Sequence, residues 1–226
     1  MNPTALVSGL RFLDSFFPSG GYAYSSGVEA AVQDGLVKTA ADLDSYVEDV
    51  FRRGIGSREA VAAARAHDAV TCCNVSMAFA TDDQLEAMQT AAESRVASRQ
   101  MGRQVLRHAA QHDDAALRKF AVAVEGERTP GHVAVALGLT LAAAGWPKQQ
   151  AIAGILYQHA VGFVSAGLKL LPMGQHDGQR LLARWTPLID ELAAAATGET
   201  PMQAWTPVQD IYAMRHSRLG SRLFRS

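Results

Sequence analysis

Apolar residues recur along most of this chain at spacings of three and four, which is the period of an amphipathic α-helix. Thr39 and Asp42 have the residue types and spacing of a helix start. The segment that follows them places its large apolar residues on one helical face: Leu43, Val47, Val50 and Phe51. Upstream, Ser26 and Glu29 have the spacing of a capping box, so Ser26 is predicted to cap a short helix.

The same pattern, divided by Gly and Pro breaks, predicts further helices. They cover 57–69, 82–112 as one bent helix or two, 115–124, 130–144 with Pro130 as its first residue, 148–171, 175–196 and 208–215. The helix 148–171 is apolar nearly all round and is expected in the middle of a bundle. Part of it is long enough to cross a membrane, but polar groups such as Gln158 favour a buried helix.

Composition agrees with a helical fold. The chain is 48% hydrophobic and only 7% aromatic, and alanine, the best helix former, carries much of the apolar content. We find no linker or internal repeat in the sequence. We therefore predict a single all-α domain over residues 1–226, built as a bundle of roughly eight to ten helices.

Charge and cysteine content narrow the function class. The net charge is -1, with 21 basic and 22 acidic residues, which argues against a nucleic-acid binder. The two cysteines, Cys72 and Cys73, are adjacent and ill-suited to bond to each other. No signal-peptide pattern precedes them. We expect a reduced, cytoplasmic protein that has no membrane segment.

The C-terminal twelve residues combine positive charge with apolar side chains. They contain four arginines and no acid, and Leu223, Phe224 and Arg225 lie just before the final Ser226. The arginines are spaced by three, four and three residues, so on a helix they would share one face. Arginine is the preferred cation for pairing at interfaces. We predict a docking tail at about 215–226, with these partner-binding residues: Arg218, Arg222, Leu223, Phe224 and Arg225.

A glycine-rich segment near the N-terminus is the second candidate for recognition. The stretch 18–27 contains no G-x-S-x-G or GK[ST] motif, so neither a nucleophile elbow nor a phosphate loop is indicated. Four aromatic residues fall within nine positions: Phe16, Phe17, Tyr22 and Tyr24. That density is typical of either a binding patch or a local core. Tyr22 and Tyr24 are the candidate partner-binding residues here.

Residues with catalytic or metal-binding chemistry are present but poorly arranged. There is no HExxH pattern and no Cys-His zinc spacing. His108 and His112 would share a helix face, which we interpret as solvated surface, and Cys72–Cys73 as a small buried or loop pair. His176–Asp177 is better explained as a capped helix start than as a general base. We assign no catalytic, cofactor or metal residue.

Four stretches together resemble the urease accessory protein UreF family. They are FPSGGYAYSSGVE at 17–29, QMG at 100–102, GQ at 174–175 with GQ at 178–179, and SRLFRS at 221–226. Their order and separations are similar to the family over nearly the whole chain. Ser217 and Gly220 depart from the Glu and Tyr that family members often have.

The resemblance implies an all-α, dimeric, cytoplasmic maturation protein without catalysis of its own. Such a protein binds a UreD/UreH-type accessory protein and a UreG-type GTPase, and it helps to deliver nickel to apo-urease. In that family the C-terminal segment becomes ordered when the UreD/UreH-type partner binds, and it supports recruitment of the GTPase. By position, Arg222 is the tail arginine implicated, and Tyr22 and Tyr24 lie in the matching N-terminal patch.

Two readings from different classes follow. The first is a non-enzymatic adaptor whose tail becomes ordered only on binding, because ordering costs about 1 kcal/mol per residue. The alternative is a helical metal carrier or enzyme that uses Cys72/Cys73 or His176/Asp177. Within the first reading, Arg222 or Arg225 could also act on the GTPase as an inserted arginine.

Overall fold

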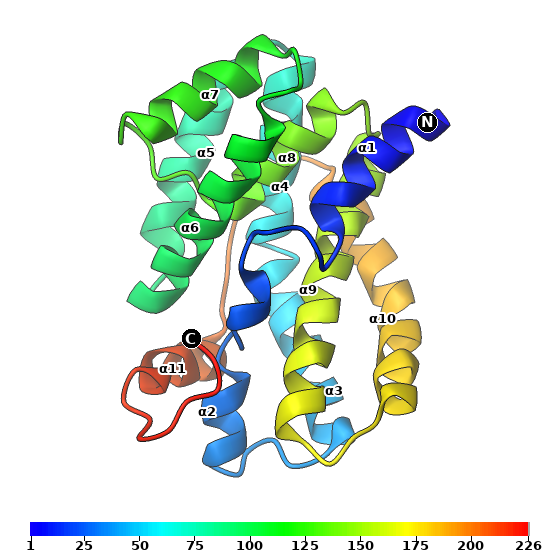
Figure 1. Cartoon of the computed structure of the whole chain (residues 1–226), viewed down its shortest axis with the longest axis vertical. Coiled ribbons are helices and arrows are strands. Elements are labelled where there is room, and N and C mark those ends of the chain that lie inside the picture. Colours follow the sequence, from blue (N-terminus) through cyan, green and yellow to red (C-terminus); the bar gives the residue numbers. More distant parts are fainter. Residues whose placement is uncertain (226) are drawn as a thin grey trace.

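The computed structural model describes residues 1–225, so the part of the tail prediction that concerns Ser226 lies outside the described residues. Over that range the chain forms eleven α-helices and no β-strand (Figure 1). The elements are α1 (Pro3–Leu13), η1 (Gly21–Ala23), α2 (Val28–Gln33), α3 (Ala40–Val50), η2 (Phe51–Ile55), α4 (Glu59–Thr71), α5 (Val75–Met88), α6 (Ala92–Ala109), α7 (Ala115–Glu125), α8 (Val133–Ala143), α9 (Lys148–Leu170), α10 (Gln175–Ala196) and α11 (Pro207–His216). The all-α prediction is confirmed, with slightly more helices than the eight to ten expected.

Short polar side chains start several of these helices. Thr39 and Asp42 form the predicted capping box: the Thr39 hydroxyl accepts the Asp42 N–H at 3.2 Å, and the Asp42 carboxylate accepts the Thr39 N–H at 2.9 Å. Asp114 accepts the backbone N–H of Leu117 at 2.8 Å at the start of α7. These bonds satisfy amides that have no partner within the helix.

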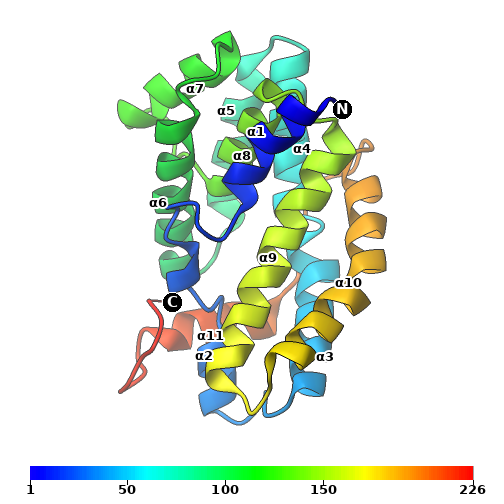
Figure 2. The same cartoon turned by 45° about the vertical axis from the view of Figure 1, so that its right-hand side comes forward.

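The interior is built around α4 and α8. In α8 eight of eleven residues are buried, and in α4 nine of thirteen. The two helices approach closely at Gly138, where an added Cβ would lie 2.3 Å from the carbonyl oxygen of Ala63. Helices α5, α6 and α7 pack on one side of this pair, and α9 with α10 on another (Figures 1 and 2).

Helix α9 is less enclosed than its composition predicts. It packs against α10, α4 and α8, but only half of its most apolar stretch is buried, and Tyr157 is exposed. By length and composition alone it is the one described helix that could cross a membrane. The most enclosed helix is α8, because α8 is small and apolar all round, whereas α9 also carries polar side chains such as Gln158 and Lys169.

Several predicted boundaries are wrong. Residues 82–112, predicted as one bent helix or two, belong to two helices, α5 and α6, but α5 already begins at Val75. The helix predicted from Pro130 begins only at Val133. The buried carboxylate of Asp82 accepts the backbone N–H groups of Gly131 and His132 at 2.6 and 2.9 Å. These contacts hold the preceding loop in a non-helical conformation, with Gly131 at φ 78°.

The arrangement brings the two ends of the sequence together. Helix α11 packs against α2 and α6 and crosses the lower part of the bundle (Figure 1). The C-terminus then lies beside the segment that precedes α2, and both views agree on this placement (Figures 1 and 2). The two stretches that the sequence singles out for recognition are therefore neighbours.

Candidate functional site

After α11 the chain turns back onto the body. Residues 217–225, which we call the tail, run as turns and extended chain beside α2. The side-chain amide of Gln33 in α2 donates to the carbonyl oxygen of Ser221 at 3.1 Å. The backbone N–H of Arg225 donates to the carbonyl oxygen of Ala23 in η1 at 2.7 Å. The tail is thus hydrogen-bonded to two separate elements of the N-terminal region.

One buried carboxylate holds the end of the tail. Glu29 lies in the first turn of α2 and is 1% exposed. Its carboxylate accepts the backbone N–H of Leu223 at 2.6 Å, the N–H of Phe224 at 3.2 Å and Nε2 of His216 at 2.7 Å. A carboxylate can be buried only where such donors replace water. We call Glu29, His216 and these two backbone amides the tail latch.

Apolar and ionic contacts surround the latch. The side chain of Phe224 is buried, and the Lys169 ammonium lies 4.8 Å from the centre of its ring. His216 is also buried, and its Nδ1 lies 3.6 Å from a carboxylate oxygen of Glu93 in α6. The latch therefore joins three regions of the chain, which are α2, α6 and the C-terminus.

The other predicted residues of the tail face solvent. Leu223 is 72% exposed, and the three tail arginines are exposed: Arg218, Arg222 and Arg225. Over residues 1–225 none of these arginines forms an ion pair. Arginine is enriched at protein interfaces, and Leu223 adds an exposed apolar side chain beside these unpaired cations.

The N-terminal aromatic residues divide between core and surface. Phe17 packs at 5.2 Å between ring centres on the buried Phe12, whereas Phe16 and Tyr22 are 95% and 72% exposed. The hydroxyl of Tyr24 donates to a side-chain oxygen of Gln100 at 2.8 Å, which ties this segment to α6. Phe17 therefore belongs to a local core, whereas Phe16 and Tyr22 are exposed, and the binding patch stays a prediction.

We define the terminal surface as the exposed side chains of these two segments: Tyr22, Arg218, Arg222, Leu223 and Arg225. The hydrogen bond between Arg225 and Ala23 joins the two segments directly. Of the seven residues predicted to bind partners, Phe224 and Tyr24 do not belong to this surface. Phe224 fills the protein's own interior, and Tyr24 is partly buried and hydrogen-bonded.

Three predictions about these segments need correction. The arginine spacing does not form a helical face, because α11 ends at His216. The tail is packed on the body of the chain alone, whereas we expected it to become ordered only on binding. Ser26 does not cap α2, which begins after Gly27 at φ 86° without a side-chain cap. An added Cβ at Gly27 would lie 3.2 Å from the backbone of Ala213 in α11, so glycine permits this close approach.

Sequence reasoning missed the role of Glu29. It assigned this carboxylate to a local cap, whereas the carboxylate binds residues about 190 positions away in the chain. The available signal was one acid within the apolar run Val28–Val32. An acid on a face that is otherwise apolar requires donors from elsewhere in the fold.

The residues considered for metal binding or catalysis are dispersed. Cys72 and Cys73 are exposed in the turn after α4, so the prediction of a loop pair fits better than that of a buried pair. The Asp177 carboxylate accepts the Gly174 N–H at 3.1 Å, which is the helix-start role predicted for it. Over residues 1–225, no three His, Cys, Asp or Glu side chains gather as a metal site requires.

Comparison with known proteins identifies the family to which this chain belongs. A family model described as UreF matches residues 37–186, which span most of the helical body. The terminal surface lies outside that match, whereas individual relatives align over nearly the whole chain. A protein of Cereibacter sphaeroides named urease accessory protein UreF is 32% identical over 98% of this chain and 99% of its own length.

Two further relatives carry the same name. The protein from a Methylobacterium species is 35% identical over 96% of this chain and 87% of its own length. The protein from Actinobacillus pleuropneumoniae is 30% identical over 96% of this chain and 97% of its own length. With the family model matched over most of the body and these relatives aligned nearly end to end, the chain belongs to the UreF family of urease accessory proteins.

Proposed function

We propose that this protein is a non-enzymatic adaptor in urease maturation, present in the cytoplasm as a homodimer. It binds a UreD/UreH-type accessory protein and a UreG-type GTPase, and so supports GTP-dependent insertion of nickel into apo-urease. Nickel is the cargo of this process. The family assignment supports a role with other maturation factors, and the terminal surface supports recognition of polypeptides.

The proposal rests on one observation: some groups of the tail bind the body, and other side chains of the tail are exposed. The latch uses Glu29, His216 and the buried Phe224 to fix the tail on the body. The same arrangement leaves Leu223 and Arg222 exposed beside Tyr22. A preorganised surface binds at a lower entropic cost than a free chain end. We therefore assign the UreD/UreH-type partner to the terminal surface.

Deletion of residues 219–226 tests the role of the tail. We expect far-UV circular dichroism to be unchanged, because α11 and the bundle remain. Capture of the UreD/UreH-type protein, and of the GTPase through the complex, should be lost, and light scattering should report a smaller assembly. Capture of both partners at the level of the full chain would contradict the proposal.

Point variants locate the contact within the tail. Leu223→Ser should weaken the complex about thirtyfold, or by about 2 kcal/mol, which is the lower limit for an interface hot spot. The matched control is Val122→Ser, which removes an exposed apolar side chain from α7, away from the tail. If the two variants bind alike, Leu223 does not contact the partner.

The same partners test whether an arginine acts on nucleotide. With Arg222→Ala, we expect loss of complex formation and an unchanged single-turnover rate of GTP hydrolysis by the GTPase. A tail arginine that pairs with an acidic surface has this effect. A slower hydrolysis rate within a complex that still assembles would instead assign Arg222 to the chemistry.

A further inference from the structure

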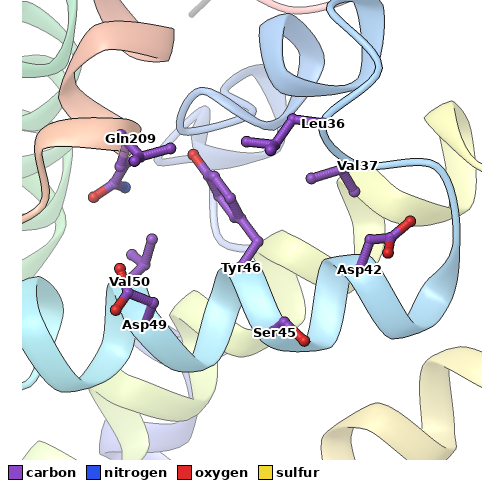
Figure 3. Close-up of a pocket in the computed structure, with 9 residues that line it drawn as sticks. Leu36, Val37, Asp42, Ser45, Tyr46, Asp49, Val50 and Gln209 are labelled. Atoms are coloured by element: carbon purple, nitrogen blue, oxygen red, sulfur yellow. The ribbon is translucent and has the colours of Figure 1, made fainter.

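A pocket of about 280 Å³ lies at the end of α11 away from the tail (Figure 3). It is formed by α3, the turn between α2 and α3, and the first turn of α11. Its lining residues are Leu36, Val37, Asp42, Ser45, Tyr46, Asp49, Val50, Val208 and Gln209. The apolar members form a floor, and Leu36 and Val208 are about half exposed at its edges.

The polar groups at the inner end of the pocket have no hydrogen-bond partners. Tyr46 is 8% exposed, and its hydroxyl is unpaired among the described residues, as is the side-chain oxygen of Gln209. Figure 3 shows the hydroxyl pointing between Leu36 and Gln209. Burial raises the pKa of Tyr46, so the phenol stays neutral. An unpaired buried acceptor is costly, and a donor supplied by a ligand removes that cost.

Two carboxylates line the pocket, those of Asp42 and Asp49. The neighbouring acids are already paired with arginines: Asp34 with Arg215, Asp44 with Arg184 and Glu48 with Arg52. Hydrogen bonds from the backbone of Lys38 and the side chain of Thr39 lower the pKa of Asp42, which keeps it ionised. Asp49 is half exposed, and its i,i+4 ion pair with Arg53 at 2.8 Å is of a kind that contributes little and is readily exchanged.

We propose that this pocket binds an arginine or lysine side chain of a partner polypeptide, next to an apolar residue of the same segment. The methylene stem of the cation would lie on the floor formed by Val37 and Val50, as long basic side chains do on apolar surfaces. The charged end would approach the Asp49 carboxylate and donate to the unpaired oxygens at the inner end. This site does not depend on the role given to the terminal surface.

The probe for the test is an end-blocked peptide, Gly-Leu-Arg-Leu-Gly, titrated into the full-length protein while methyl NMR signals are followed. We expect saturable shifts at the methyl groups of Val37, Val50 and Val208. The same peptide with citrulline in place of arginine keeps the shape and loses the charge. It should bind about tenfold more weakly, as expected when a charge-assisted contact is lost.

Variants of the pocket complete the test. Asp49→Asn should weaken binding of the arginine peptide about tenfold, and Tyr46→Phe about threefold, since it removes one neutral acceptor. The controls are Asp83→Asn, the same charge change at an exposed site on α5, and Tyr157→Phe on α9. Neither control should change binding.

Three outcomes would overturn the assignment. Equal binding of the arginine and citrulline peptides would mean that the pocket selects only apolar residues. Absence of shifts at these methyl groups would remove the site. If the same methyl shifts appear without peptide as the protein concentration rises, the occupant is a second copy of this chain and not a different partner.

Discussion

The contact between α4 and α8 and the tail latch are held by opposite means. Where α8 crosses α4, Gly138 faces the backbone at Ala63, and the contact consists of shape and apolar surface. At the latch, one carboxylate replaces its water with donors from distant residues. Adding atoms at Gly138 should disrupt the contact between α4 and α8. Removing the Glu29 carboxylate should disrupt the latch. Packing thus secures the body, and directed hydrogen bonds place the surface that we propose to bind partners.

The largest effect is expected from adding atoms to the body. Gly138→Val would bring its Cβ to the position 2.3 Å from the Ala63 carbonyl oxygen, so the helices must separate. We expect the free energy of unfolding to fall by about 3 kcal/mol, the upper part of the range for overpacking. The control is Gly162→Ala in α9, where a Cβ meets nothing within 4 Å. It should raise stability by up to about 1 kcal/mol, and equal losses would contradict the close contact.

Removing the carboxylate tests the latch. Glu29→Ala leaves His216 and the amides of Leu223 and Phe224 without their acceptor, at a cost of about 2 kcal/mol. Hydrogen exchange at those two amides should become at least tenfold faster, while α8 stays protected. Glu125→Ala, at an exposed site, should change neither region. Unchanged exchange at residues 223–224 would show that other contacts hold the tail.

A partly buried histidine of the body, His159, provides a pH test. Burial lowers the pKa of His159 below its usual value of 6.5, despite the nearby Glu59 carboxylate. As pH falls through 6.5 the unfolded chain takes up this proton before the folded chain does, so stability falls. We expect thermal unfolding to shift downward between pH 7.5 and 5.5, with a shallower dependence in His159→Gln. The exposed His176→Gln serves as control, and a slope unaffected by His159→Gln would contradict the shift.

The smallest effect is expected at the pocket of Figure 3. Tyr46→Phe removes a buried hydroxyl that has no hydrogen-bond partner within residues 1–225 and keeps the ring, so stability should rise by about 0.5 kcal/mol. Chemical denaturation would measure this change. A loss of stability would mean that the hydroxyl is hydrogen-bonded in solution. The pocket would then be held by a hydrogen bond, as the latch is, and not by packing alone as the body is.

Periodicity predicted the helices because amphipathic spacing reflects a preference of the local chain. The helix start at Thr39 and the extent of α9 followed from sequence alone. The late start of α8 did not, because Asp82, about fifty residues away in the sequence, holds the preceding loop. Composition singled out the two terminal segments, whose role in recognition stays a prediction. The latch was missed because a carboxylate at a helix start has a local explanation that is equally consistent with the sequence.

By itself the sequence determined the all-α class, most helix positions and the two terminal segments with the chemistry of recognition, since these depend on side-chain type and short-range spacing. Only the tertiary structure decided that Phe224 turns inward while Leu223 stays exposed, and that Glu29 serves the distant tail. Burial and hydrogen-bond partners depend on which segments meet in space. These long-range contacts depend on how the whole bundle packs, and a local sequence pattern does not specify them.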